Sequence, residues 1–213
     1  MIDGEAVFTQ EVPWDPKTQT DPAYLYHHLS SALHRAAAEL PRVDAIGGSS
    51  AGVIVDNEIR LASLLRSIPA ERFPEAAAVF KRIQQEWKVP LVVMNDGDVT
   101  ALAGALSLRK TGVLGIAMGS SEAAGFIDRQ GRIPGWLNEL AFAPVDYQPS
   151  AAVDEWSGDA GVGALYFSQQ AVNKLLPAAK IKLPKAMDLP ERLVEVQELM
   201  AKGDERAAKI YET

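Results

Sequence analysis

The sequence predicts an α/β fold, because short apolar segments alternate with amphipathic ones along most of its length. Two of the apolar segments end in small polar residues: the first in Asn95-Asp96-Gly97 and the second in Gly119-Ser120-Ser121. Open α/β folds bind their ligands where such strands end. The first strand end would supply a carboxylate and the second a turn able to hold a phosphate, which together favour phosphoryl transfer.

Composition limits the classes of protein to consider. The chain has 213 residues, 47% hydrophobic and 23% charged, which is typical of one large or two small globular domains. Its net charge of -7 and isoelectric point near 5.0 argue against a nucleic-acid surface or an anionic membrane as partner. We therefore predict no nucleic-acid partner and no membrane partner.

The chain contains no cysteine, which excludes a disulfide framework, a thiolate nucleophile and a cysteine-ligated zinc ion. The first residues lack the basic and apolar regions of a signal peptide, and no apolar run approaches the length that crosses a bilayer. These features lead us to expect a cytoplasmic protein.

The first elements are predicted from turn residues and periodicity. Residues 5 to 12 are predicted as a strand, because Asp3-Gly4 before them is typical of a tight hairpin turn. Asp21-Pro22 then predicts the start of an amphipathic helix that ends at Pro41. Its three histidines are expected to pack on or near the helix surface, since a metal site needs three or four converging ligands.

Residues 43 to 46 are predicted as a short buried strand that leads into a glycine-rich turn, Gly47 to Gly52. The two terminal glycines have the spacing of a P-loop, but Val53 replaces its lysine and a β-type run follows where a helix is required. We reject the P-loop, and the dinucleotide fingerprint for the same reason. Asp56-Asn57-Glu58 is then predicted as a turn between two short strands.

A second amphipathic helix follows Pro74 and reaches Trp87, a strand covers residues 89 to 94, and a helix covers 99 to 108. Strands at 113 to 118 and 123 to 128, a turn and Arg132-Ile133 then restart a β meander, so we expect two domains, 1–111 and 112–213. The later expectations are a loop, a helix and a charged amphipathic helix, at residues 143 to 158, 160 to 176 and 193 to 213.

The order of these motifs between residues 43 and 142 resembles the ROK sugar kinases of the actin-like ATPase superfamily. The resemblance begins at the glycine-rich turn Gly-Gly-Ser-Ser-Ala-Gly. It continues in three motifs, in this order: Val-Val-Met-Asn-Asp-Gly-Asp, Gly-Ile-Ala-Met-Gly-Ser-Ser-Glu-Ala-Ala-Gly-Phe-Ile-Asp and Asn-Glu-Leu-Ala-Phe. It implies a ribonuclease H-like fold of two α/β domains with the substrate cleft between them.

The first motif would carry catalysis. The resemblance implies that Asn95 hydrogen-bonds a sugar hydroxyl and that Asp96 is the general base for the attacking hydroxyl. Phosphoryl transfer needs in-line positioning, a proton acceptor and charge neutralisation, and Asp96 would supply the acceptor. The alternative is that Asn95-Asp96-Gly97 is a turn in which the aspartate caps the next helix.

The resemblance implies that the second motif holds the phosphates of ATP, with Mg²⁺, at Gly119, Ser120 and Ser121. Small residues there let backbone N–H groups approach an anion. Ser121 stands where the family has a glycine, and Glu122 is expected to add negative charge near the phosphates. The alternative is an ordinary hairpin of small residues.

The third motif, Asn138-Glu139-Leu140-Ala141-Phe142, stands where many of these kinases have Gly-Glu-x-Gly-His. The resemblance implies that Glu139 contacts sugar hydroxyls. Phe142 cannot ligate zinc and the family's cysteine cluster is absent, so we predict no zinc. Glu139 could equally be a surface residue.

The family's first phosphate loop, Asp-x-Gly-Gly-Thr, and its later Gly-Gly segment at the adenosine pocket are not found in the sequence. We therefore expect a fold that is incomplete at both termini and a chain that is a fragment of a longer protein. The leading hypothesis is a sugar kinase that uses ATP and Mg²⁺ and forms a homodimer, the commonest oligomer. The alternatives are a non-catalytic carbohydrate-binding or sensing protein and a structural subunit on the same fold.

Overall fold

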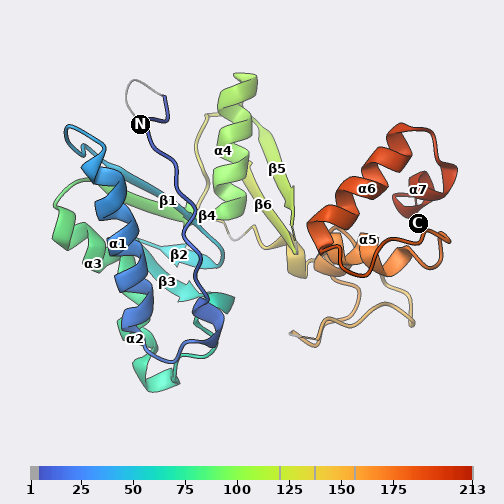
Figure 1. The fold of residues 1–213 in the computed structure, drawn as a ribbon, viewed down its shortest axis with the longest axis horizontal. Coiled ribbons are helices and arrows are strands. Elements are labelled where there is room, and N and C mark those ends of the chain that lie inside the picture. Colours follow the sequence, from blue (N-terminus) through green and yellow to red (C-terminus); the bar gives the residue numbers. More distant parts are fainter. Residues whose placement is uncertain (1–4, 120, 137, 156, 213) are drawn as a thin grey trace. The chain divides into compact units, whose positions relative to one another are not determined.

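The computed structural model describes residues 5–119, 121–136, 138–155 and 157–212 of the chain. The chain divides into two compact units, Met1–Asp96 and Gly97–Thr213. Figure 1 labels the helices and strands of both units. Both units contain helices and strands. One cluster of buried apolar residues lies in the first unit, and two separate clusters lie in the second.

The first unit is built on a parallel pair of strands, β1 (Ile46–Ser50) and β4 (Leu91–Asn95). Their register pairs Ile46 with Leu91 at one end and Ser50 with Asn95 at the other. β1 starts where the predicted strand was expected to end and includes glycines that were predicted as a turn. The reason is tertiary, because β4 supplies backbone partners to a segment whose own residues favour a loop.

The hairpin β2 (Val53–Val55) and β3 (Glu58–Leu61) confirms the turn predicted between them. Asp56 and Asn57 have φ angles of 52° and 57°, the left-handed backbone that tight hairpin turns require. The Asn57 side chain then bonds β4: its Nδ2 donates to the Leu91 carbonyl at 2.8 Å and its Oδ1 accepts from the Val93 N–H at 2.9 Å. One amide thus satisfies two backbone groups of β4.

The described part of the first unit also contains the helices α1 (Ala23–Ala38), α2 (Phe73–Ala77) and α3 (Val79–Trp87). α2 and α3 contact the strands, and α1 packs on both of these helices. Both amphipathic helices predicted in this region are confirmed, although the second is interrupted at Ala78. The Asp21 carboxylate accepts from the Ala23 N–H at 3.1 Å, as expected of a capping residue. Figure 1 shows α1 beside α3, and side chains of both helices pack into one core.

The strand predicted over residues 5 to 12 is wrong. The described residues 6–15 contain no regular secondary structure, and the side chains of Val7 and Phe8 are exposed. A strand is stable only when its backbone is paired and one face is covered. No other segment that the structure describes forms a strand pair with these residues.

The second unit contains the antiparallel hairpin β5 (Val113–Met118) and β6 (Glu122–Ile127), packed against α4 (Asp96–Leu108). Glycines allow this close packing, because Cβ atoms added at Gly97, Gly115 and Gly125 would lie only 2.2 to 2.5 Å from backbone atoms of the opposing element. The predicted strands and helix are therefore confirmed, while residues 132 and 133 do not form a further strand.

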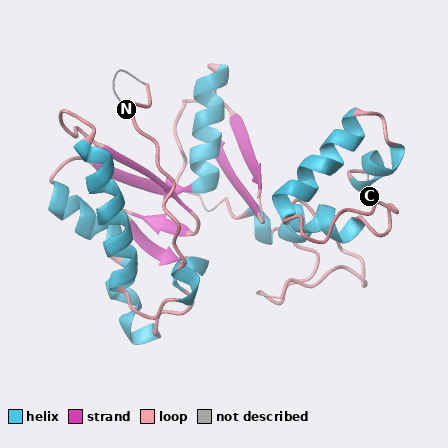
Figure 2. Ribbon diagram, viewed as in Figure 1, coloured by secondary structure: helices cyan, strands magenta, loops and turns pink. Residues whose placement is uncertain are grey.

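The remainder of the second unit is helical and irregular (Figure 2). The predicted helix over residues 160 to 176 shortens to α5 (Gln169–Leu175). The predicted C-terminal helix becomes α6 (Leu189–Ala201) and α7 (Glu205–Ile210), separated at Gly203, which has a φ of 84°. Among the described residues, no helix is both long and apolar enough to span a membrane.

Candidate functional site

The first predicted site lies where β4 ends and α4 begins. Asn95 is the last residue of β4 and Asp96 the first of α4. Nδ2 of Asn95 donates a 2.9 Å hydrogen bond to the Gly52 carbonyl, in the loop that follows β1. The glycine-rich segment after residue 46 and the Asn95-Asp96 pair, which are distant in sequence, are thus in contact in the structure.

Asp96 is half-buried. The residue after it, Gly97, is buried with no room for a side chain, because an added Cβ would lie 2.2 Å from the Ala124 carbonyl oxygen. This contact fixes the first turn of α4 on β6. The close contact therefore holds Gly97, the residue after Asp96, against β6.

The second predicted site is the turn between β5 and β6. Ser120 lies outside the described residues. Gly119 donates its N–H to the Ser121 carbonyl at 2.9 Å and accepts from the Gln169 N–H at 3.0 Å. The turn is therefore attached to the start of α5, where the buried hydroxyl of Ser168 accepts from the Ala171 N–H at 3.2 Å. Sequence reasoning missed Gln169, and only the serine cap before a helical run points to it.

Glu122 follows this turn and corrects an expectation. We expected its charge to lie near bound phosphates, but the residue is only 7% exposed and Oε2 of its carboxyl has no hydrogen-bond partner among the described residues. Burial raises the pKa of this carboxyl above its usual range. An added Cβ at Gly163 would lie 2.5 Å from Oε2, which places the carboxyl group in the interior beside that glycine.

The third predicted site contains Glu139, which is half-buried and precedes a short 3-10 turn, Leu140–Phe142. Its neighbour Asn138 donates from Nδ2 to Oδ1 of Asp98 at 3.2 Å. Burial raises the pKa of Asp98, and the hydrogen bond from Asn138 opposes that shift. Asp98 was missed as a site residue. Its one sequence signal is its place two residues after Asp96.

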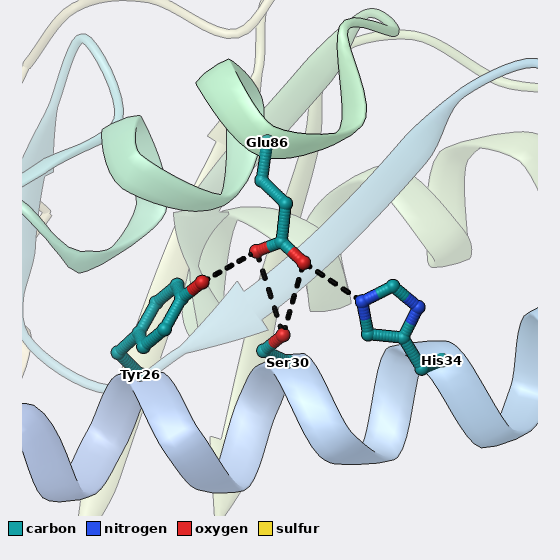
Figure 3. A network of polar contacts seen from close by, with 4 residues as sticks. All are labelled: Tyr26, Ser30, His34 and Glu86. Atoms are coloured by element: carbon teal, nitrogen blue, oxygen red, sulfur yellow. Dashed lines mark hydrogen bonds and ion pairs between the residues drawn. The ribbon is translucent and has the colours of Figure 1, made fainter.

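The histidines have the packing contacts expected of them. Figure 3 shows Glu86 of α3 facing one side of α1, where it accepts hydrogen bonds from Tyr26 at 2.8 Å and Ser30 at 3.2 Å and contacts Nε2 of His34 at 2.7 Å. His28 lies over the ring of Tyr24, with 4.0 Å between ring centroids. Within the described part of the chain, no three His, Cys, Asp or Glu residues are grouped as a metal ion would need.

Comparison with known proteins gives matches in structure but not in sequence. No family model matches the sequence, and no curated protein matches it either. Among solved structures, a ROK hexokinase from Thermus thermophilus has a TM-score of 0.59 at 16% identity over 87% of this chain and 59% of its own. A ROK family transcriptional regulator, a homologue of the Escherichia coli MLC protein, has a TM-score of 0.63 at 20% identity over 89% of this chain and 48% of its own.

A ROK family glucokinase from Streptomyces griseus, solved with glucose and AMPPNP, has a TM-score of 0.59 at 18% identity over 91% of this chain and 64% of its own. The chain thus spans roughly half to two thirds of the length of these three proteins. At these identities the likeness concerns the fold. The chain has an α/β fold like that of ROK sugar kinases and regulators, as the resemblance in sequence implied.

Proposed function

From the fold shared with ROK family proteins, we infer that this chain is the sugar-binding part of a ROK-type sugar kinase, with Asp96 as the general base. The observation that carries the proposal is the placing of Asn95 and Asp96 at the junction of β4 and α4. This junction lies at the carboxyl end of a strand in a parallel pair, where α/β folds bind their ligands.

The residues would act as follows. Asp96 would accept the proton of the sugar hydroxyl that attacks the γ-phosphorus of ATP, and the hydroxyl oxygen would form the new P–O bond as the bond to the leaving ADP breaks. Asn95 and Glu139 would hydrogen-bond other sugar hydroxyls. The Asn95–Gly52 hydrogen bond supports this role for Asn95, because it fixes the orientation of the amide.

ATP with Mg²⁺ would supply the phosphoryl group and neutralise the charge that develops on it. Gly119, Ser120 and Ser121 would lie against the phosphates. Their fit is supported by the small side chains of the turn. The N–H of Gly119, however, is already bonded to the Ser121 carbonyl.

The occupied Gly119 N–H favours a second candidate function, a carbohydrate sensor that binds sugar without using ATP. The fold is also like that of a ROK family transcriptional regulator, with a TM-score of 0.63. In this alternative Asn95 and Glu139 would keep their roles and Asp96 would bind a hydroxyl without accepting its proton. For both functions we further propose a cytoplasmic homodimer.

The test measures glucose phosphorylation and, by calorimetry, the binding of glucose and of ATP to the full-length protein. Asp96→Asn should abolish phosphorylation while glucose still binds, since the amide keeps the shape and hydrogen-bonding capacity but cannot accept the proton. Asp56→Asn is the matched control. It makes the same change of charge in the β2–β3 turn, where Asn also tolerates the left-handed backbone.

Equal phosphorylation by Asp96→Asn and wild type would overturn the assignment of the base. Glucose binding without ATP binding would favour the sensor. Binding of neither ligand, tested with a panel of hexoses and amino sugars, would count against both functions.

A further inference from the structure

Two carboxyl side chains lie against the segment that contains Glu139, and the proposed reaction uses neither. We propose that Asp98 and Glu122 are positioning residues that hold residues 138–140 from two sides, with Glu122 as a neutral carboxyl group that donates to the Leu140 carbonyl. The orientation of Glu139 toward a sugar then depends on pH. This role for Glu139 rests on the proposed function, whereas the holding of the segment does not.

Asp98 holds the first side. It lies in the first turn of α4 and accepts a 3.2 Å hydrogen bond from Nδ2 of Asn138, the residue directly before Glu139. α4 is itself fixed on β6, because Gly97 and Gly125 leave no space between the two elements. The side chain of Asn138 is therefore attached to a rigid part of the second unit.

Glu122 holds the second side. A Cβ added at Gly163 would lie 2.5 Å from Oε2 of Glu122 and 2.6 Å from the carbonyl oxygen of Leu140, so both oxygens border the same point. The Leu140 carbonyl already accepts from the Ala143 N–H at 3.0 Å, and a carbonyl oxygen can accept a second hydrogen bond. A protonated Glu122 carboxyl group has an O–H that can donate this second hydrogen bond to the Leu140 carbonyl oxygen.

The surroundings of Glu122 favour the neutral carboxyl. β5, the 3-10 turn Leu140–Phe142 and the 3-10 turn Gly163–Leu165 contain no ionisable side chain, and the nearest ionisable neighbours of these turns in sequence are Glu139 and Tyr166. α4 also packs on β6, and its ionisable side chains are those of Asp96 and Asp98. Among the described residues of these elements, no side chain is a cation that would stabilise a carboxylate. Burial raises the pKa of its carboxyl accordingly.

The consequence is a change of contact as pH rises. When Glu122 loses its proton, a buried carboxylate without a donor faces the carbonyl oxygen of Leu140, and the two oxygens repel each other. The contact of Glu122 with the Leu140 carbonyl would then be lost, while the hydrogen bond from Asn138 to Asp98 would remain. Sugar affinity that depends on Glu139 should fall as pH rises through the raised pKa of Glu122.

The first experiment compares hydrogen exchange of peptides that cover residues 138–143 in the full-length protein over a range of pH. Glu122→Gln keeps the shape of the side chain and has a donor N–H at every pH, while Glu122→Leu has neither donor nor charge. Wild type and Glu122→Gln should match at low pH, and wild type should exchange roughly three to ten times faster at high pH, as expected for one lost hydrogen bond. Glu122→Leu should exchange fast at every pH.

The second experiment measures glucose affinity over the same pH range, with Glu205→Gln on the exposed start of α7 as control. Glu122→Gln should bind with a flat pH profile, whereas wild type and the control should lose affinity as pH rises. Asp98→Asn should keep the bond from Asn138 and bind normally, whereas Asp98→Ala should bind several times more weakly.

Exchange that is identical in wild type and Glu122→Gln at every pH would overturn the role of Glu122, as would full protection in Glu122→Leu. If wild type binds no sugar while exchange follows the expected pattern, the proposed function fails and the holding of the segment stands. Normal glucose affinity in Asp98→Ala would remove Asp98 from the proposal.

Discussion

The side-chain amide of Asn95 donates a 2.9 Å hydrogen bond to the backbone carbonyl of Gly52. Asn95 ends β4, and Gly52 follows β1, the strand that runs parallel to β4. The bond therefore links β4 to the loop after β1, at the end of the strand pair where the proposed catalytic residue Asp96 lies. It also gives Asn95 a structural role that can be measured separately from sugar binding.

We expect Asn95→Ala and Asn95→Asp each to lower the free energy of unfolding by about 1 kcal/mol, because both remove the donor to the Gly52 carbonyl. Urea unfolding, followed by circular dichroism, measures the effect. The aspartate has nearly the same size as asparagine but places a carboxylate oxygen against the Gly52 carbonyl, so its loss should be at least as large as that of Asn95→Ala. An Asn95→Asp variant with the unfolding midpoint of wild type would show that the bond contributes nothing to stability.

The two glycines of α4 should respond to alanine in opposite ways. Gly97→Ala should destabilise the protein by about 1 to 3 kcal/mol or more, because its Cβ would lie 2.2 Å from the Ala124 carbonyl oxygen. Gly104→Ala should stabilise it by up to about 1 kcal/mol, since the nearest atom, on Val113, is 3.8 Å away and alanine favours a helix. Thermal unfolding of both variants measures these effects. Equal shifts of the unfolding temperature in the two variants would contradict this packing of α4 on β6.

Substitution of Asn57 should separate its side-chain bonds from its backbone conformation. Asn57→Gly keeps the left-handed turn but removes both bonds to β4, and we expect a loss of roughly 1 to 3 kcal/mol. Asn57→Ala should lose about 1 kcal/mol more, because alanine also resists the φ of 57°. Chemical unfolding of both variants measures this. An Asn57→Gly variant as stable as wild type would show that water replaces the side chain on β4.

The Glu86 network of Figure 3 should make stability depend on acid pH. Hydrogen bonds from Tyr26, then His34 and Ser30, hold the pKa of Glu86 below its usual range. A carboxyl whose pKa is lowered by folding stabilises the protein above its unfolded pKa, and this contribution is lost as pH falls through the folded pKa. Stability should therefore decline on acidification more in wild type than in Glu86→Gln.

The control for this measurement is Glu39→Gln, at the exposed C-terminal end of α1. It should keep the acid profile of wild type, because Glu39 is outside the network. Parallel acid profiles for wild type and Glu86→Gln would contradict the role of Glu86. The effect should be modest, since the carboxylate is partly exposed and solvent weakens its interactions.

Local patterns predicted much of the secondary structure. The helix after Asp21, the hairpin at Asp56-Asn57, and the strand that leads to Asn95 were found from capping residues, turn residues and apolar periodicity, each a property of neighbouring residues. The strand over residues 5 to 12 was wrong for the converse reason, since no segment among the described residues forms a strand pair with residues 6–12. The extent of β1 also depended on a partner, because β4 pairs with its glycines.

The sequence by itself determined the α/β class, the order of the elements and the three motifs that resemble ROK sugar kinases. Only the tertiary structure decided what those motifs contact: Asn95 bonds Gly52, Asp98 bonds Asn138, and Glu122 is buried beside Gly163. The physical reason is that the protonation and orientation of a polar side chain depend on the groups that surround it. In this protein those groups come from segments that are distant in sequence.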